Sequence, residues 1–129
     1  MNKDFTKHNQ ALALKELGFD EPCNTCYDKL EIVASYGASV FDYKNYNTSG
    51  YMVSRPTFSQ AFRWFREKYG LYSAIVPKKS WPDNFVSGIE WYVEICGGNG
   101  IEIGPDGTYS YKEAESACLD KLIEIIKNK

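Results

Sequence analysis

The apolar residues between Thr57 and Gly70 recur every three or four positions, which is the period of an amphipathic helix. They would form one bulky stripe, whose members are Phe58, Ala61, Phe62, Phe65 and Tyr69. Thr57 precedes the stripe and Gln60 follows three residues later, at the spacing of a capping box. Gly70 occupies the position where a left-handed residue commonly ends a helix. The pattern predicts a central helix with two defined ends, and Trp64 lies off the centre of its stripe.

The same period predicts one helix near each end of the chain. The first covers residues 7–17, and Gly18 and Phe19 follow it in the order of a Schellman end. The last begins at Ser110, where Glu113 completes a second capping box. Its inner stripe consists of Ala114, Cys118, Leu122 and Ile125. Both segments are therefore expected to bury one face against other elements.

The segments between the first two helices predict short strands. Residues 29–35 and 40–46 carry β-branched and alternating apolar residues, so we expect them to form a hairpin. Residues 51–53 predict a further short strand before the central helix. The composition of residues 23–26 and 47–50 is that of loops.

A second group of strands follows the central helix. Residues 71–76 predict a short strand that Pro77 stops. Residues 85–96 show the clearest alternation of apolar and polar positions in the chain. The glycine-rich turn at 97–100 then leads to a returning strand at 101–103. Short turns favour antiparallel pairing, so we predict an α+β fold in which one mostly antiparallel sheet carries three helices on one face.

Composition narrows the class of protein. The chain has 129 residues, enough for a single globular domain over residues 1–129 that needs neither a metal nor a disulfide to fold. Its net charge of −2 argues against nonspecific nucleic-acid binding, which leaves a basic footprint. No apolar run reaches the roughly 18–20 residues of a membrane span, and the polar start lacks a signal-peptide core. We therefore expect a cytoplasmic protein without membrane association.

The residues that carry catalysis or metal binding are sparse. His8 is the single histidine and is expected to be a solvated surface residue, which leaves no histidine-based catalytic arrangement in view. Cys23 and Cys26 have the spacing of a redox pair or of half a zinc site, and Cys96 and Cys118 would have to complete such a site. Free thiols are the simpler interpretation, so we predict no metal, no cofactor and no enzymatic activity.

The three arginines of the chain lie in or just before the central helix. Arg63 and Arg66 are three residues apart and share a helix face, with Trp64 beside them and Arg55 near the helix start. Planar guanidinium groups and an aromatic ring are what anionic, base-bearing ligands use. The alternative is a solvated helix face on which Arg63 pairs with Glu67.

Three stretches of the sequence, residues 10–23, 56–71 and 113–126, resemble one group of proteins in this order. The group consists of small uncharacterised proteins of phages and prophages in gut Bacteroidales. The run after Cys23 departs from the more aromatic one expected for that group, which weakens any special role for Cys26. The resemblance implies a phage or prophage origin in a bacterial host and brings no reaction, cofactor or catalytic residue with it.

Two hypotheses about function follow. The first is a non-enzymatic accessory protein, an adaptor that binds another phage or host protein, which the ten tyrosines favour because tyrosine is common at interfaces. The second is a protein that binds or sequesters a small anionic or nucleotide-like ligand of host defence. In that case Arg55, Arg63, Arg66 and Trp64 are the expected site.

Overall fold

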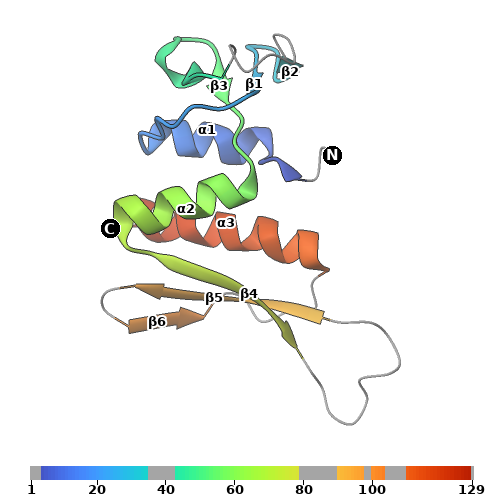
Figure 1. Cartoon of the computed structure of the whole chain (residues 1–129), viewed down its shortest axis with the longest axis vertical. Helices are drawn as coiled ribbons and strands as arrows, with labels where there is room; N and C mark the ends of the chain where they lie inside the picture. Colours follow the sequence, from blue (N-terminus) through green and yellow to red (C-terminus); the bar gives the residue numbers. More distant parts are fainter. Residues whose placement is uncertain (1–3, 35–42, 79–89, 98–99, 104–109, 129) are drawn as a thin grey trace. The chain divides into compact units, whose positions relative to one another are not determined.

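A computed structural model describes residues 4–34, 43–78, 90–97, 100–103 and 110–128 (Figure 1). These residues form three α-helices, a 3-10 helix and two small antiparallel sheets, which confirms the predicted α+β class. Contacts within the chain separate two compact units, Met1–Ala61 and Phe62–Lys129, here called unit 1 and unit 2. The single domain over residues 1–129 stays a prediction.

Helix α1 (His8–Glu16) of unit 1 ends as its sequence predicts. Gly18 adopts a φ of 95°, which a residue without a Cβ accepts easily. The N–H of Phe19 then donates to the carbonyl of Leu14 at 2.9 Å, and the N–H of Gly18 donates to that of Lys15 at 3.0 Å. These are the two hydrogen bonds of a Schellman motif, and they direct the chain away from the helix axis.

The sheet of unit 1 has the order β2-β1-β3, with β1 (Cys26–Tyr27), β2 (Val33–Ala34) and β3 (Val53–Ser54). The expected continuous strand over 29–35 is therefore wrong in its first half, which forms the turn between β1 and β2. The expected hairpin partner 40–46 lies partly outside the described residues. Its described end differs from the prediction because the Asn45 side chain accepts the N–H of Asn47 at 2.9 Å and begins the 3-10 helix η3 (Tyr46–Thr48).

Helix α2 (Phe58–Tyr69) begins in unit 1 and continues into unit 2. Thr57 Oγ1 accepts the N–H of Gln60 at 3.1 Å, which confirms the predicted N-cap. Gly70 has a φ of 66°, as expected for the residue that ends the helix. Four side chains of α2 are buried, namely those of Phe58, Ala61, Trp64 and Phe65. The buried stripe is thus rotated toward Trp64 relative to the predicted one, and Phe62 is only half-buried.

The sheet of unit 2 has the order β4-β5-β6, with β4 (Tyr72–Lys78), β5 (Glu90–Gly97) and β6 (Gly100–Ile103). Pro77 does not stop β4, as the sequence predicted, but pairs with Trp91 inside the strand. An edge strand tolerates proline because its outward-facing N–H groups have no strand to bond. The first part of the strand predicted at 85–96, residues 85–89, lies outside the described residues.

Helix α3 (Tyr111–Lys127) packs on β4 and β5 of the same unit (Figure 1). The Ser110 side chain accepts the N–H of Glu113 at 3.2 Å and the Glu113 carboxylate accepts the N–H of Ser110 at 2.9 Å, so the predicted capping box is present. The Trp91 and Tyr111 rings meet edge to face at 5.0 Å. The strands of the described residues form two sheets, so the single sheet expected from the sequence is corrected.

None of the helices in the described part of the chain has the length and apolar character needed to cross a lipid bilayer.

Candidate functional site

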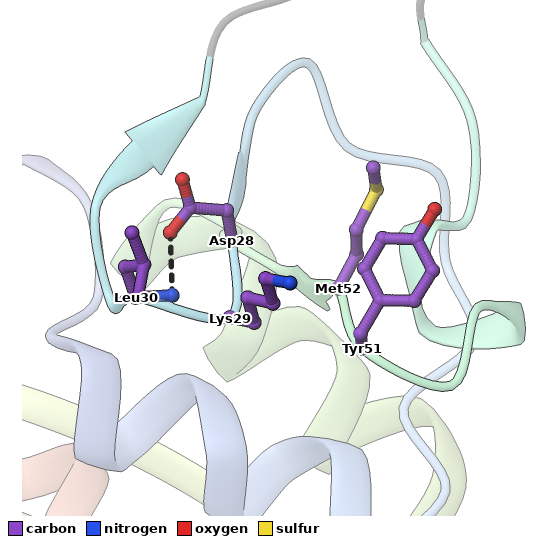
Figure 2. A pocket seen from close by; sticks show the side chains of 5 residues that line it. All are labelled: Asp28, Lys29, Leu30, Tyr51 and Met52. Atoms are coloured by element: carbon purple, nitrogen blue, oxygen red, sulfur yellow. Dashed lines mark hydrogen bonds between the residues drawn. The ribbon is translucent and has the colours of Figure 1, made fainter.

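A shallow pocket of about 530 Å³ lies in unit 1, between the β1–β2 turn and the segment that precedes β3. It is lined by Asp28, Lys29, Leu30, Tyr51 and Met52. Figure 2 shows Asp28 and Leu30 on one side and Tyr51 and Met52 on the other, with the Lys29 side chain between them. The pocket therefore combines two chain segments that are about twenty residues apart in the sequence.

The β1–β2 turn holds its shape through the side chain of Asp28. Asp28 Oδ1 accepts the N–H of Leu30 at 2.8 Å and that of Ile32 at 3.1 Å. Glu31 lies between them with a φ of 64°, a conformation that non-glycine residues rarely adopt. This local network presents apolar side chains to solvent: Leu30 is 69% exposed and Ile32 is 58% exposed.

The opposite wall of the pocket is fixed by a lysine of helix α1. Lys15 Nζ donates to the carbonyl of Ser49 at 3.0 Å and to that of Met52 at 2.8 Å. These bonds hold the segment 49–52 at both ends, so the backbone of Tyr51 is positioned by its neighbours on either side. The Tyr51 side chain is nevertheless 61% exposed. A rigid backbone thus carries a large aromatic side chain that is accessible to a partner.

Arg55 lies apart from this pocket, within the interior of unit 1. It is only 5% exposed, and its guanidinium carbon is 4.2 Å from the centroid of the Phe5 ring and 5.6 Å from that of Tyr27. The Tyr27 hydroxyl donates to the carbonyl of Thr6 at 2.6 Å. The Arg55 backbone N–H donates to the carbonyl of Thr25 at 3.0 Å. Arg55 is therefore packed among aromatic rings rather than placed on a solvated face.

His8, predicted to be a solvated surface residue, is partly exposed, with 24% of its side chain accessible, and it also contacts two other side chains. Its ring meets the Tyr27 ring edge to face at 5.1 Å, and Nδ1 is 3.6 Å from Oε1 of Glu31. The sequence did not indicate these contacts, because the turn that contains Glu31 lies beside the first turn of α1, a proximity that no local pattern reveals. The His8 ring is therefore one of the rings that pack against Tyr27.

The other residues of the predicted ligand site belong to the part of α2 in unit 2. Arg63 and Arg66 are exposed, whereas Trp64 is buried. The Trp64 ring packs against those of Phe65 at 5.2 Å and Tyr69 at 5.4 Å, so this indole belongs to a buried aromatic cluster on α2. A ligand site that uses the three arginines together stays a prediction.

Comparisons with known proteins identified no relative of this chain. No family model matches the chain, and neither a curated protein nor a solved structure matches it.

Three of the four thiols, those of Cys23, Cys26 and Cys118, are buried. Burial raises the pKa of Cys23 to about 12 and that of Cys118 to about 11, and it also raises the pKa of Cys26. Thiolates are the reactive form of cysteine, so these three residues are poor nucleophiles near neutral pH. Among the described residues, no group of three or more histidine, cysteine or carboxylate side chains is placed to hold a metal ion.

We expect the native protein at pH 8 to react with a thiol reagent at Cys23, Cys26 and Cys118 at least about tenfold more slowly than the denatured chain. The raised pKa values of Cys23 and Cys118 keep these two thiols protonated at pH 8, so their reaction rates should continue to rise with pH until the raised pKa values are reached. Alkylation followed by mass spectrometry of peptides measures each rate. Half-buried Cys96 serves as the internal reference, and rapid labelling of Cys23 in the folded protein would contradict the expectation.

Sequence reasoning missed the residues that form the pocket. Leu30 and Ile32 alternate with Lys29 and Glu31, and this alternation predicts a strand with one apolar face without indicating whether that face is buried. The available clue was Asp28, whose short side chain favours turns by accepting backbone N–H groups ahead of it. No comparable clue marks the burial of Arg55.

Proposed function

We propose that this protein is a non-enzymatic adaptor that binds another protein through the surface around the unit 1 pocket. The resemblance to phage and prophage proteins of gut Bacteroidales supports a phage or host protein in the bacterial cytoplasm as the partner. We call this region the pocket surface and define it by Leu30, Ile32, Tyr51 and Met52 with the flanking charges of Asp28 and Lys29.

The exposure of large apolar side chains at one place is the observation that carries the proposal. Leu30 and Tyr51 line the pocket and are both mostly exposed, and Ile32 follows on the same turn. Exposed apolar groups of this size that adjoin a pocket are typical of sites where a protein surface is covered by a partner. Tyrosine and methionine are also enriched at protein interfaces.

The shape of the pocket favours a protein partner over an enclosed small molecule. Its lining comes from one face of two chain segments, and Figure 2 shows the five side chains arranged around an open space. Such a depression can receive one apolar anchor side chain from a partner, while Asp28 and Lys29 offer polar contacts at its margin. Because Lys15 and Asp28 hold both walls by hydrogen bonds to backbone, little ordering is needed on binding.

Three buried thiols are not activated as nucleophiles. Cys23, Cys26 and Cys118 have raised pKa values, and the histidine is engaged with Tyr27 and Glu31. Neither group provides an activated nucleophile in the described part of the chain.

A reconstituted complex tests the proposal. The tagged protein is purified from its bacterial host, the bound protein is identified by mass spectrometry, and the two are recombined as pure components for calorimetry. Tyr51→Ser and Leu30→Ser are each expected to raise the Kd about 10–100-fold, the range found when an interface anchor is truncated. Analytical ultracentrifugation of the protein alone distinguishes a second copy of the chain from a different partner.

Tyr72→Ser is the matched control, because Tyr72 is 57% exposed, close to the exposure of Tyr51, but lies on β4 of unit 2. It should leave the Kd unchanged. A complex that is insensitive to Tyr51→Ser and Leu30→Ser, or weakened only by Tyr72→Ser, would refute the pocket surface as the binding site. Circular dichroism verifies that each variant is folded.

A small anionic or nucleotide-like ligand remains the second candidate. The observation in its favour is Arg55, a buried guanidinium whose Nε has no hydrogen-bond partner among the described residues. Calorimetric titration with a panel of nucleotides tests it. Binding that survives combined replacement of Arg55, Arg63 and Arg66 by alanine would exclude the arginines as the site.

A further inference from the structure

We propose that Arg55 is the binding residue for an oxyanion, a phosphate or carboxylate group that approaches its guanidinium in the plane of its N–H bonds. The inference concerns the interior of unit 1 alone. It depends neither on the pocket surface nor on Arg63 and Arg66.

Arg55 carries a positive charge that the described residues leave without an ionic partner. The ion pair seen in the described part of unit 1 joins His8 and Glu31, and the ion pairs found among the described residues do not include Arg55. The hydrogen bonds of Arg55 come from its backbone, which bonds Thr25. A buried charge without a counter-charge is unfavourable, so a binding anion would meet a strong attraction there.

The aromatic surroundings determine how such an anion can approach. The guanidinium carbon is 4.2 Å from the Phe5 ring centroid, which places the cation over the face of the ring. Tyr27 lies further away at 5.6 Å, and its hydroxyl is committed to the carbonyl of Thr6. A guanidinium held over an aromatic ring can still offer its N–H groups to two oxygens in a bidentate contact.

The backbone around Arg55 is well fixed, as a binding residue requires. Arg55 follows β3, and its N–H donates to the Thr25 carbonyl at 3.0 Å beside the β1–β3 pairing. Pro56, the next residue, accepts hydrogen bonds from both the N–H of Thr6 at 3.0 Å and its hydroxyl at 3.1 Å. Phe5 pairs with Thr57 through a backbone bridge. Cation, ring and backbone are thus held together before any ligand arrives.

The arginine side-chain signals of the full-length ¹⁵N-labelled protein test the inference, because the chain contains only three arginines. Arg63→Lys and Arg66→Lys assign the Nε–Hε signals by elimination and leave Arg55 intact. The probes are inorganic phosphate and acetate, each titrated against sodium chloride at matched ionic strength to remove general screening. We expect the Arg55 signal to move and saturate with a Kd on the order of 1–10 mM, while the Arg63 and Arg66 signals move little.

The two probes distinguish the source of the oxyanion. Saturation by phosphate alone supports a phosphate-bearing ligand, saturation by acetate alone supports a carboxylate, and saturation by both supports an oxyanion site that accepts either. The proposal would be overturned if the Arg55 signal did not move with either probe. It would also be overturned if the chemical-shift change of Arg55 were no larger than those of Arg63 and Arg66.

Arg55→Lys provides a second measurement, because lysine keeps the charge and lacks the planar fork. Backbone N–H signals of Thr25 and of position 55 replace the lost side-chain signal as reporters. We expect the affinity for the effective probe to fall about tenfold or more. Unchanged affinity in a folded Arg55→Lys variant would also overturn the proposal, and the titration of the unaltered chain decides alone where this variant does not fold.

Discussion

Replacing Phe65 by alanine is expected to lower the free energy of unfolding by about 3–5 kcal/mol. Phe65 is fully buried on α2, and its ring packs against those of Trp64 at 5.2 Å and Tyr69 at 5.8 Å. Removing it takes away the buried apolar surface and leaves a cavity that the neighbouring rings cannot fill, since aromatic side chains are stiff. Urea unfolding monitored by tryptophan fluorescence and circular dichroism measures the loss.

Phe62 provides the comparison on the same helix. The sequence placed Phe62 and Phe65 in one apolar stripe with equal weight, but Phe62 is only half-buried. Phe62→Ala should therefore cost clearly less than Phe65→Ala. Equal losses for the two variants, or a loss below about 1 kcal/mol for Phe65→Ala, would show that the buried stripe is not rotated as described.

Replacing Leu14 by alanine is expected to cost about 2–5 kcal/mol. Leu14 is fully buried on α1, and its carbonyl accepts the N–H of Phe19 in the Schellman end of the helix. Leucine and alanine both favour helices, so the loss comes from packing rather than from helix propensity. The same urea titration gives the value.

Leu12→Ala is the matched control, because Leu12 lies on the same helix and is 39% exposed. Its cost should remain below about 1 kcal/mol. A cost for Leu14→Ala no greater than that of Leu12→Ala would contradict the packing of α1.

The two variants also test the single domain that the sequence predicts. Leu14 belongs to unit 1 and Phe65 to unit 2. If the chain unfolds as one cooperative domain, both substitutions should shift the same transition, observed by both optical methods. Separate transitions, each shifted by one substitution, would mean that the units fold independently.

The helices were predictable because their ends depend on neighbouring residues. Ser110 and Glu113, three residues apart, form reciprocal hydrogen bonds between side chain and backbone N–H. Gly18 and Gly70 adopt the left-handed conformation at the ends of α1 and α2. Such motifs are contained in a few consecutive residues, so the sequence alone reveals them. The strands of unit 1 were harder to predict, since two-residue strands such as β1 and β2 carry almost no alternation.

The sites were less predictable because burial depends on distant residues. Arg55 comes shortly before a helix, and its immediate neighbours in the sequence do not indicate burial. Its guanidinium nevertheless lies over the rings of Phe5 and Tyr27, which are distant in the sequence. Leu30 resembles a strand residue with one face toward a core, yet the Asp28 side chain turns its segment outward. Neither outcome follows from local composition, because each depends on which segments meet in three dimensions.

Pro77 also affects how this protein resists self-association. Among the described strands, β4 has a partner on one side only, and seven residues of unpaired edge are a template on which another chain can add a strand. Proline provides no N–H donor at position 77, so an incoming strand would lose a hydrogen bond there. The residue that was expected to end the strand instead makes this edge a poor start for fibril growth.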